Sequence, residues 1–351
     1  MQQIKVKIVK VSDETPDTRS FYIERVDGLP ISYAAGQFIT LLFDINGRDV
    51  RRSYSLGSSP GFEKDVFITV KRKENGEISR KLQDCYRNGD LLTCLLPAGT
   101  FVKEARWGAD LYYFFFAAGS GIVPVFSIAK SLLHEDPQAR IVLCNQAVSE
   151  KNIIYKAQLE KIATQYENLE YLLYLSAPLD HETPVRRLNN LRVENIVKER
   201  LPNKEQCEKA RFYLCGPTTF MRMVRFTLKL DGFNDEQIRQ EQFVIQETRQ
   251  PPPLINDTSP KHVKILSDEG VFEFDVQYPE SILDAGKKAH ITLPYSCGAA
   301  QCSTCAVRCV SGEVLMGKND ILTQKDLDRG FVLTCTGHPA SDVILDYTNK
   351  N

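Results

Sequence analysis

Residues 111–129, "LYYFFFAAGSGIVPVFSIA", contain no charged side chain over 19 positions, nearly the length of a membrane-spanning helix. The stretch divides into two elements rather than one. Leu111–Ala118 is an apolar, aromatic-rich run of strand length that ends at Gly119-Ser120-Gly121. Apolar residues at helical spacing follow, at Val125, Ile128, Ala129, Leu132 and Leu133. This pattern predicts a buried parallel strand that leads into a helix, and it argues against a membrane span.

The surrounding sequence, about 105–245, alternates strand-like and helical stretches, as α/β domains do. The other strand-like runs are "RIVLCNQA" (140–147), "LEYLLYLSA" (169–177) and "ARFYLCGP" (210–217). Between the first two of these runs, one apolar helix face is expected from Tyr155, Leu159, Ile162, Ala163 and Tyr166. The sequence therefore predicts a parallel sheet covered by helices.

Two of the predicted strands end in small residues, at Gly119-Ser120-Gly121 and at Cys215-Gly216-Pro217. Both loops belong to the carboxyl edge of the predicted sheet, where a backbone without Cβ atoms lets a dinucleotide approach. Pro124 occupies the third position of what would be a G-x-G-x-x-G motif. Either string alone barely favours nucleotide binding over a tight turn, but two such loops at one edge favour it more strongly.

The first third of the chain, 1–104, contains short β-type runs separated by turn signals, which predicts a small antiparallel barrel. Within it, "RRSYSLGSSP" (51–60) places Arg52 and Tyr54 on one side of a strand and Ser53 and Ser55 on the other. Further on, "NGEISRKLQD" (75–84) has a turn at Asn75-Gly76 and then Ser79 as the expected N-cap of a short helix. Free backbone N–H groups at such a helix start can hold a phosphate.

Four cysteines crowd into "PYSCGAAQCSTCAVRC" (294–309), and Cys335 follows in "VLTCTGHP". A disulfide framework fits poorly, because such frameworks belong to small secreted domains. Structural zinc usually needs two CxxC-type pairs, and only one is present. Cys297, Cys302, Cys305 and Cys335 instead match the plant-type [2Fe–2S] spacing C-x4-C-x2-C…C at all four positions. We therefore predict cluster ligation by these four thiols, with Cys309 a spare thiol.

The proline-rich stretch "QETRQPPPLINDTSP" (246–260) resists both helix and sheet and is expected to be a linker. The expected domains are thus 1–104, 105–245 and 260–351, with 246–259 between the last two. The 351 residues hold 44 Lys and Arg against 45 Asp and Glu, a net charge of −1, which argues against a nucleic-acid or polybasic membrane partner. The N-terminal "MQQIKVKIVK" alternates like a strand and lacks the apolar core of a signal peptide, so a cytoplasmic location is expected.

The order of these motifs resembles the ferredoxin–NAD(P)H reductase superfamily. More narrowly, it is similar to oxygenase reductases with a fused C-terminal plant-type ferredoxin, such as those of the phenylacetyl-CoA epoxidase type. The resemblance covers nearly the whole chain. It implies a multidomain protein with an antiparallel β-barrel for flavin, a parallel α/β sheet for the nicotinamide nucleotide, and an α+β β-grasp ferredoxin domain.

The resemblance also implies cofactors and site residues. FAD would be held by Arg52, Ser53, Tyr54, Ser55, Val70, Gly76, Ile78 and Ser79. The nicotinamide nucleotide would be lined by Gly119, Ser120, Gly121, Pro124, Gly216 and Pro217. Catalytic positions beside the nicotinamide and the flavin would be Cys215, Glu241 and Phe243.

Two positions depart from the family pattern. The cluster loop has Ala300 where relatives carry glycine, so a positive φ there is strained and cluster stability or potential is expected to differ. The strand end "NQAVSEK" has Gln146 where relatives often carry an arginine, which weakens the case for the 2′-phosphate of NADPH. Lys151 or Arg192 are other sources of that charge, so the choice between NADH and NADPH stays open.

The expected function is the conversion of a two-electron donor into single electrons. NAD(P)H supplies a hydride to FAD, and the [2Fe–2S] cluster passes electrons one at a time to an acceptor protein such as an oxygenase component. Alternative acceptors are a desaturase or a cytochrome. An alternative of another class is a redox-sensing electron carrier, which the nucleotide motifs disfavour because such a carrier needs only residues 260–351.

Overall fold

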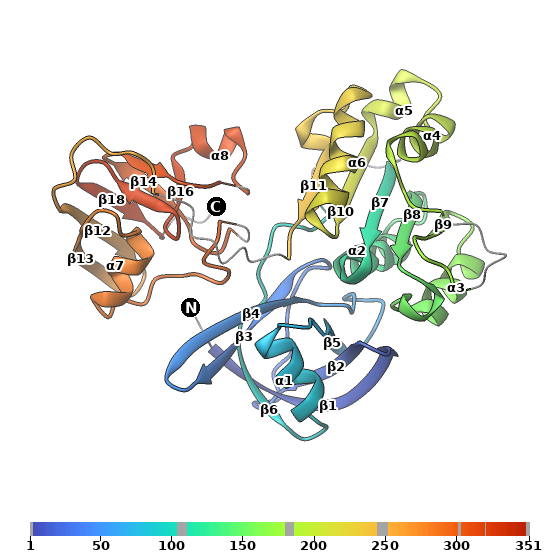
Figure 1. The fold of residues 1–351 in the computed structure, drawn as a ribbon, viewed down its shortest axis with the longest axis horizontal. Coiled ribbons are helices and arrows are strands. Elements are labelled where there is room, and N and C mark those ends of the chain that lie inside the picture. The colour runs from blue at the N-terminus through green and yellow to red at the C-terminus, as the bar shows by residue number, and fades with distance from the viewer. Residues whose placement is uncertain are drawn as a thin grey trace. The chain divides into compact units, whose positions relative to one another are not determined.

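The computed structural model describes residues 3–103, 111–179, 186–243, 252–300, 303–319 and 321–348. The chain divides into two compact units, residues 2–244 and 245–351. The first unit holds an antiparallel sheet followed by a parallel one, and the second holds a smaller mixed sheet (Figure 1). Each unit has hydrophobic clusters of its own.

The N-terminal part of the first unit is a six-stranded antiparallel sheet in the order β4-β3-β6-β1-β2-β5. Its strands are β1 (Gln3–Thr15), β2 (Thr18–Arg25), β3 (Phe38–Ile45), β4 (Arg48–Ser55), β5 (Val66–Lys71) and β6 (Leu91–Leu95). A bridge between Leu56 and Ile68 joins the two edge strands and closes the sheet into a barrel. The alternating Ile4, Val6 and Ile8 point into its core, as the period of a strand requires.

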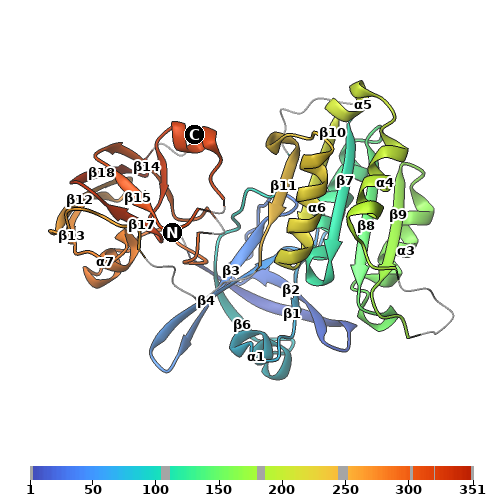
Figure 2. The same cartoon turned by 45° about the horizontal axis from the view of Figure 1, so that its top comes forward.

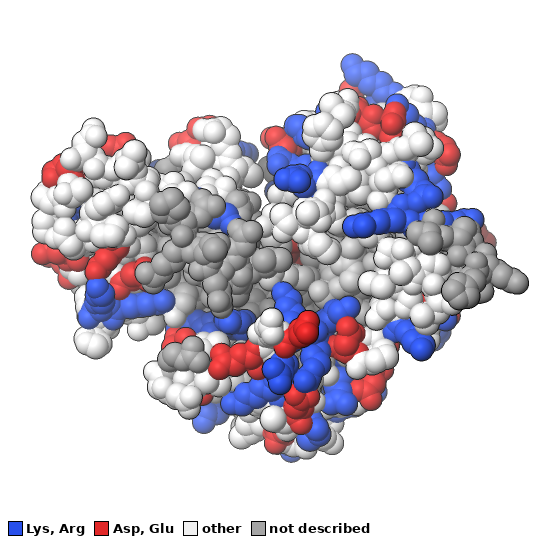
Figure 3. Space-filling model, viewed as in Figure 1, with Lys and Arg blue, Asp and Glu red and all other residues white. Residues whose placement is uncertain are grey.

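Helix α1 (Glu77–Cys85) covers one opening of the barrel with the buried Ile78 and Leu82. The prediction that Ser79 is its N-cap is wrong, because the helix begins two residues earlier and Gly76 is the N-cap. The Ser79 hydroxyl instead accepts the Lys73 N–H at 3.1 Å and donates to the Gly76 carbonyl at 3.2 Å. Charged side chains of both signs intermingle over this barrel face (Figure 3). The ion pairs of the barrel include Arg72–Asp84 and Arg19–Asp13.

The C-terminal part of the first unit is a five-stranded parallel sheet in the order β11-β10-β7-β8-β9. Its strands are β7 (Tyr112–Ala118), β8 (Arg140–Ala147), β9 (Leu169–Leu175), β10 (Ala210–Cys215) and β11 (Ile238–Glu241). Its helices are α2 (Ile122–Glu135), α3 (Lys156–Gln165), α4 (Asn190–Arg200), α5 (Lys204–Glu208) and α6 (Thr218–Leu230). The described residues of this part also form short 3-10 turns, η2 (Gly119–Gly121), η3 (Glu150–Asn152) and η4 (Asp235–Gln237).

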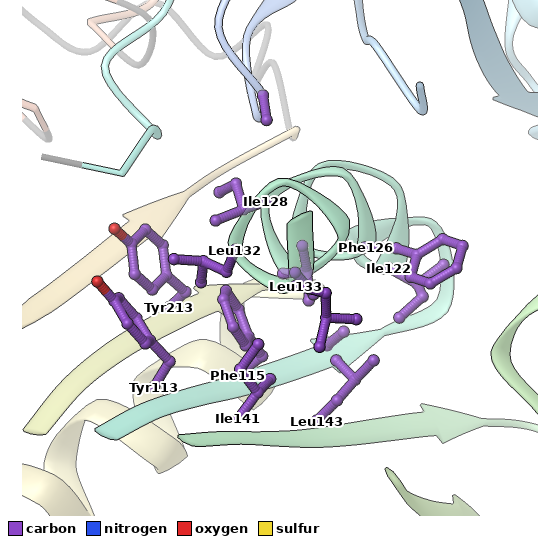
Figure 4. Close-up of a cluster of buried hydrophobic side chains, with 14 of the residues drawn as sticks. Tyr113, Phe115, Ile122, Phe126, Ile128, Leu132, Leu133, Ile141, Leu143 and Tyr213 are labelled. Carbon is purple, nitrogen blue, oxygen red and sulfur yellow. The ribbon is translucent and has the colours of Figure 1, made fainter. Parts of the chain in front are cut away.

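The charge-free stretch 111–129 is the centre of this sheet, as predicted: it forms β7, η2 and the first half of α2. Alternate residues of β7 face opposite layers. Tyr113 and Phe115 lie beneath α2 (Figure 4), in a cluster that also holds side chains of α3. Phe114 and Phe116 pack under α4 and α6, which lie on one face of the sheet in Figure 2. No helix among the described residues is long and apolar enough to span a membrane.

The expected helix face that begins at Tyr155 needs a correction. Helix α3 starts at Lys156, and Tyr155 is its N-cap with a left-handed φ of 61°. Leu159 and Ile162 are buried on the sheet as expected. Tyr155 is buried as well, but its ring contacts Phe126 and Phe67, which belong to α2 and to the barrel.

The second unit has a five-stranded mixed sheet in the order β13-β12-β18-β14-β16 and a two-stranded sheet of β15 and β17. The strands are β12 (Lys261–Ser267), β13 (Gly270–Val276), β14 (Ala306–Ser311), β15 (Val314–Met316), β16 (Phe331–Leu333), β17 (Gly337–Pro339) and β18 (Val343–Asp346). Strands β12 and β18 pair in parallel, and α7 (Ile282–Lys288) packs on the same core through Ile282 and Leu283. A short helix, α8 (Gln324–Asp328), completes the β-grasp arrangement.

Candidate functional site

The expected flavin strand is β4, which pairs with β3 along its whole length. The Ser53 hydroxyl lies 3.1 Å from the Thr40 hydroxyl of β3. Tyr54, on the opposite face, packs against the barrel core, and burial raises the pKa of its phenol above the ordinary value. The Tyr54 side chain is therefore a neutral phenol at physiological pH, able to donate or accept a hydrogen bond.

The expected phosphate site is the first turn of α1, with Gly76, Ile78 and Ser79. The N–H groups of a first helical turn have no acceptor within the helix, so they can bind an anion. This helix is held to the barrel by Gln83, whose side-chain amide donates to the Val70 carbonyl at 2.6 Å. Val70 itself is fully buried in the barrel core, close in sequence to the turn that precedes α1.

The two small-residue loops at the carboxyl edge of the parallel sheet lie against each other. A Cβ added to Gly121 would sit 2.1 Å from the Cys215 carbonyl oxygen, so only glycine fits there. Gly119 has a φ of 56° and faces open space, because a Cβ there would meet no atom within 4 Å. Pro124 lies in the first turn of α2, where its missing N–H has no partner to lose. The loops thus present an open, backbone-lined surface suited to a nucleotide.

Glu241 connects this edge with the flavin strand. It lies at the end of β11 in register with Cys215 of β10, and it is 9% exposed. The Ser55 hydroxyl donates to the Glu241 carboxylate at 3.3 Å. Burial, with the nearby Glu241 carboxylate, raises the pKa of Cys215 well above its ordinary value, so this residue is a neutral thiol. Phe243 is partly buried and packs against the hydrophobic side chains beneath α2.

The described cysteines of the expected cluster site are Cys297, Cys305 and Cys335, and Cys302 lies outside the described residues. The sulfurs of Cys305 and Cys335 are 3.2 Å apart, too far for a disulfide bond. Backbone N–H groups point at two of the sulfurs: Ala299 N lies 3.3 Å from Cys297 Sγ, and Ala300 N lies 3.4 Å from Cys335 Sγ. Soft thiolates with N–H donors suit an iron–sulfur cluster.

No three Cys, His, Asp or Glu side chains are grouped tightly enough to hold a metal among the residues that the structure describes. Those residues hold three of the four expected thiols, so a complete ligand set needs Cys302. Ala300 has a positive φ of 59°, the condition under which strain is expected there, and it is 1% exposed. The expected strain relative to glycine therefore exists in the backbone of this loop.

Sequence reasoning missed two buried polar residues that join the barrel to the parallel-sheet part. Lys130 of α2 contacts the turn after β4, and the Tyr155 hydroxyl contacts the Thr69 hydroxyl of β5. A signal was available for Lys130, because it is the first charged residue after the uncharged stretch 111–129 and sits between Ile128 and Leu132 on an apolar helix. No comparable signal marked Tyr155.

Comparisons with known proteins agree with this arrangement. Three family models match successive parts of the chain: an oxidoreductase FAD-binding domain over residues 5–102, an oxidoreductase NAD-binding domain over 115–225, and a 2Fe-2S iron-sulfur cluster binding domain over 266–340. They confirm the fold class and the three cofactors predicted from the sequence.

Curated relatives match over nearly the full length. The ferredoxin reductase component of 3-ketosteroid-9-alpha-monooxygenase from Mycolicibacterium smegmatis is 30% identical, over 97% of this chain and 96% of its own. The glycine betaine monooxygenase reductase subunit of Pseudomonas aeruginosa is 29% identical over 97% and 94%. A component of the 1,2-phenylacetyl-CoA epoxidase of Escherichia coli is 28% identical over 98% and 97%.

Among solved structures, phthalate dioxygenase reductase superposes with a TM-score of 0.62 over 98% of both chains at 22% identity, which supports the fold. The fold and the three matched domains define an NAD(P)H-dependent flavin and iron–sulfur reductase. The chain belongs to the ferredoxin–NAD(P)H reductase superfamily, among the oxygenase reductases that carry a C-terminal plant-type ferredoxin domain. The resemblance inferred from the sequence is thereby confirmed.

Proposed function

We propose that this protein passes electrons from NAD(P)H to the oxygenase component of an enzyme system. The observation that carries the proposal is the Ser55–Glu241 hydrogen bond, because it joins the flavin strand to the carboxyl edge of the nucleotide sheet within one compact unit. The names of the relatives, which are reductase components of monooxygenases and a component of an epoxidase, support an oxygenase as the acceptor. We place the protein in the cytoplasm, because its electron donor is a cytoplasmic metabolite.

When bound, FAD takes a hydride from the nicotinamide and gives up single electrons, which the [2Fe–2S] cluster hands on. The work of the chain is to bind and orient these groups. Arg52 and the first-turn N–H groups of α1 at Ile78 and Ser79 would hold the flavin phosphates, with the N-cap Gly76, whose N–H donates to the Lys73 carbonyl, shaping the turn. The flavin would be lined by Ser53, Tyr54 and Ser55, with the fully buried Val70 supporting this site from the barrel core.

The backbone of Gly119 and Ser120 would receive the nicotinamide nucleotide, with the buried Gly121 and Pro124 shaping the loop beneath it and with Gly216 and Pro217 in the neighbouring loop. Cys215 is fully buried and keeps its proton, so it would support the nicotinamide site from beneath the sheet edge. We assign Glu241 and Phe243 to the flavin end of the same edge. The hydrogen bond between Ser55 and Glu241 orients both side chains.

The cluster would be ligated by Cys297, Cys302, Cys305 and Cys335. The N–H groups of Ala299 and Ala300 would stabilise the negative charge on the Cys297 and Cys335 sulfurs. We assign the FAD barrel to residues 1–104, the nucleotide domain to 105–245, the linker to 246–259 and the ferredoxin domain to 260–351. Residues 252–260 form no helix or strand, in keeping with a linker.

An anaerobic visible spectrum tests the proposal. The purified protein is expected to show flavin bands over a broad iron–sulfur absorbance, and the flavin bands are expected to bleach on titration with NADH or NADPH. Bound zinc, or the absence of flavin after anaerobic purification, would contradict it.

The substitution Arg52→Ala sharpens this test. It is expected to lose flavin and to keep the cluster absorbance, because alanine leaves the phosphate charge unpaired. Arg51→Ala is the matched control, since Arg51 is the neighbouring arginine on the other face of β4 and pairs with Asp49. Equal flavin content in both variants would show that the phosphate site lies elsewhere.

A further inference from the structure

Lys130 is a buried cation in the middle of α2. Its side chain is 2% exposed, and its ammonium group donates to the Gly57 carbonyl at 2.9 Å and forms an ion pair with Glu63. The ammonium also lies 4.6 Å from the centre of the Phe126 ring and 5.5 Å from that of Phe67. Lysine is almost never buried to this degree without a specific partner.

The two partners of Lys130 belong to the segment that follows the flavin strand. Gly57 comes two residues after β4, and its N–H donates to the Phe67 carbonyl of β5 at 2.9 Å. Glu63 lies in the same connection, and its carboxylate accepts the Ser59 N–H at 2.7 Å. The ammonium group therefore binds a turn that is itself hydrogen-bonded on both sides.

Lys130 belongs at the same time to the helix that starts at the nucleotide loop. It comes nine residues after Gly121, or about 13 Å along the helix axis. One turn earlier, the Ser127 hydroxyl donates to the Ser58 carbonyl at 2.6 Å and accepts the Gly36 N–H at 3.3 Å. Helix α2 is thus connected by directional bonds to barrel loops on the side opposite the parallel sheet.

An ion pair at this depth adds little to stability. Removing an ammonium and a carboxylate from water costs about as much free energy as their attraction returns, and apolar residues of similar size often serve equally well. Burial lowers the pKa of Lys130, and Glu63 opposes that shift. An apolar side chain at this position would pack against the turn but would form no directional bond. It would therefore not specify the rotation of α2 about its axis.

We propose that Lys130 is a positioning residue for hydride transfer, which fixes α2 and the loop Gly119–Gly121 against the 57–63 turn of the flavin strand. The inference rests on the proposed function of this site. Hydride transfer requires the reacting atoms within about 3.5 Å, and a misplacement of about 1 Å by a distant substitution can cost about a hundredfold in rate. A rotation of α2 would cause such a misplacement of the loop Gly119–Gly121.

The test compares Lys130→Met with Ser131→Ala in the full-length protein. Methionine keeps the length and burial of the side chain but removes the charge and the donors. Ser131 is the next residue of α2 and is also buried, and its hydroxyl donates to Glu135 of the same helix, so its loss leaves the contacts of Lys130 with Gly57 and Glu63 intact. The readouts are stopped-flow flavin reduction at saturating NADH and amide hydrogen exchange of residues 57–63 and 119–126, with and without flavin.

In Lys130→Met, flavin reduction is expected to slow by about 10- to 100-fold at saturating NADH, with flavin content retained. Both segments are expected to exchange faster, also in the flavin-free protein. Ser131→Ala is expected to match the wild type in every readout. Lys130→Arg is expected to recover part of the rate, because its guanidinium can reach the same two acceptors.

Glu63→Gln keeps the test decisive should Lys130→Met not fold. It removes only the negative charge, and it is expected to slow flavin reduction in the same direction. A rate within twofold of the wild type in the folded variants, or a loss confined to NADH affinity, overturns the inference while the proposed function stands. A wild-type flavin that neither nucleotide reduces overturns both.

Discussion

The nucleotide loop (Gly119–Gly121) and the cluster loop (297–305) both contain residues with a left-handed backbone conformation. They accommodate this conformation in different ways. At the nucleotide loop, Gly119 takes a φ of 56° and Gly121 touches the Cys215 carbonyl so closely that no side chain fits. At the cluster loop, Ala300 and Ser303 take φ values of 59° and 54° with side chains present. In the nucleotide loop, the space beside Gly121 excludes a side chain. In the cluster loop, the left-handed conformation of a residue with a side chain costs about 1–2 kcal/mol per residue.

The difference teaches what holds each loop. The nucleotide loop is positioned by backbone packing between two strand ends, so Gly121 is a steric requirement, whereas Gly119 has open space and supplies the left-handed φ. The cluster loop persists in a costly conformation because its surroundings over-determine it. Those surroundings are the amide-to-sulfur contacts of Ala299 and Ala300, together with the proposed ligation of iron. Substitutions in the two loops are therefore expected to fail for different reasons.

The largest effect is expected when a ligand of the cluster is removed. Cys302→Ser replaces a soft thiolate, so the iron content is expected to fall and the reduction of a protein acceptor such as cytochrome c to drop by at least about a hundredfold. Ferricyanide reduction is expected to persist, because a small acceptor can reach the flavin. Cys309→Ser is the control, since that thiol donates to the Ser311 carbonyl and belongs to no proposed ligand set.

A chain that ends at residue 250 extends the same test, because residues 2–244 form a compact unit. It is expected to bind flavin and to oxidise NAD(P)H with ferricyanide, and to lose the reduction of cytochrome c. Undiminished reduction of a protein acceptor by the shortened chain would mean that electrons do not leave through the thiol loop.

Gly121→Ala is expected to have the next largest effect. The new Cβ would lie 2.1 Å from the Cys215 carbonyl oxygen, so the two edge loops must separate. We expect kcat/KM for NADH to fall by about a hundredfold or more, with flavin retained. Gly28→Ala serves as the control, because Gly28 has a φ of 74° but open space around it, so only backbone strain is introduced. Similar kinetics in both variants would contradict a steric role for Gly121.

The choice of nucleotide is expected to be a smaller effect, with kcat/KM favouring NADH over NADPH by about tenfold or less. Gln146 has no positive charge with which to bind a 2′-phosphate, and its side-chain oxygen already accepts the Leu188 N–H at 2.8 Å. Arg192 lies near the same edge, where it donates to the Arg187 carbonyl. A strong NADPH preference that disappears in Arg192→Ala would reverse the prediction and identify the phosphate-binding residue.

Ala300→Gly is expected to change least. Glycine relieves about 1–2 kcal/mol of left-handed strain, but it gives up the burial of one methyl group, about 0.8 kcal/mol, and adds backbone entropy to the unfolded chain. The net change in the free energy of unfolding is expected to stay within about 1 kcal/mol. Ala300→Val is the contrasting variant, because a β-branched residue tolerates this φ poorly. The midpoint of denaturant unfolding, compared between each variant and the wild type, measures both changes.

The sequence predicted those parts of the molecule that local patterns specify. Alternation in "IKVKIV" indicated the first barrel strand, and the uncharged run 111–129 indicated the central strand and its helix. The side chains of a helix or a strand alternate between buried and exposed with a fixed period along the chain, so periodicity is enough to reveal such an element. The boundaries were less accessible: α1 begins before Ser79, and Tyr155 precedes α3, because each cap depends on contacts with other elements.

For the candidate site, residue types and spacing were sufficient to name the two glycine loops and the four thiols. Thiol spacing is informative because one short loop supplies three ligands to a single cluster, whatever the rest of the fold does. A positive φ at Ala300 could be considered from the sequence, since a glycine was expected at that place. Its value of 59° came only from the structure.

Only the tertiary structure decided how the barrel and the nucleotide sheet are joined. Ser55 and Glu241 are 186 positions apart, Lys130 and Gly57 are 73 apart, and Tyr155 and Thr69 are 86 apart. No periodicity connects residues at such separations, because their contact depends on how two independently patterned sheets pack. A buried lysine looks in sequence like any lysine, and its role emerges once its carboxylate, carbonyl and aromatic partners are brought around it.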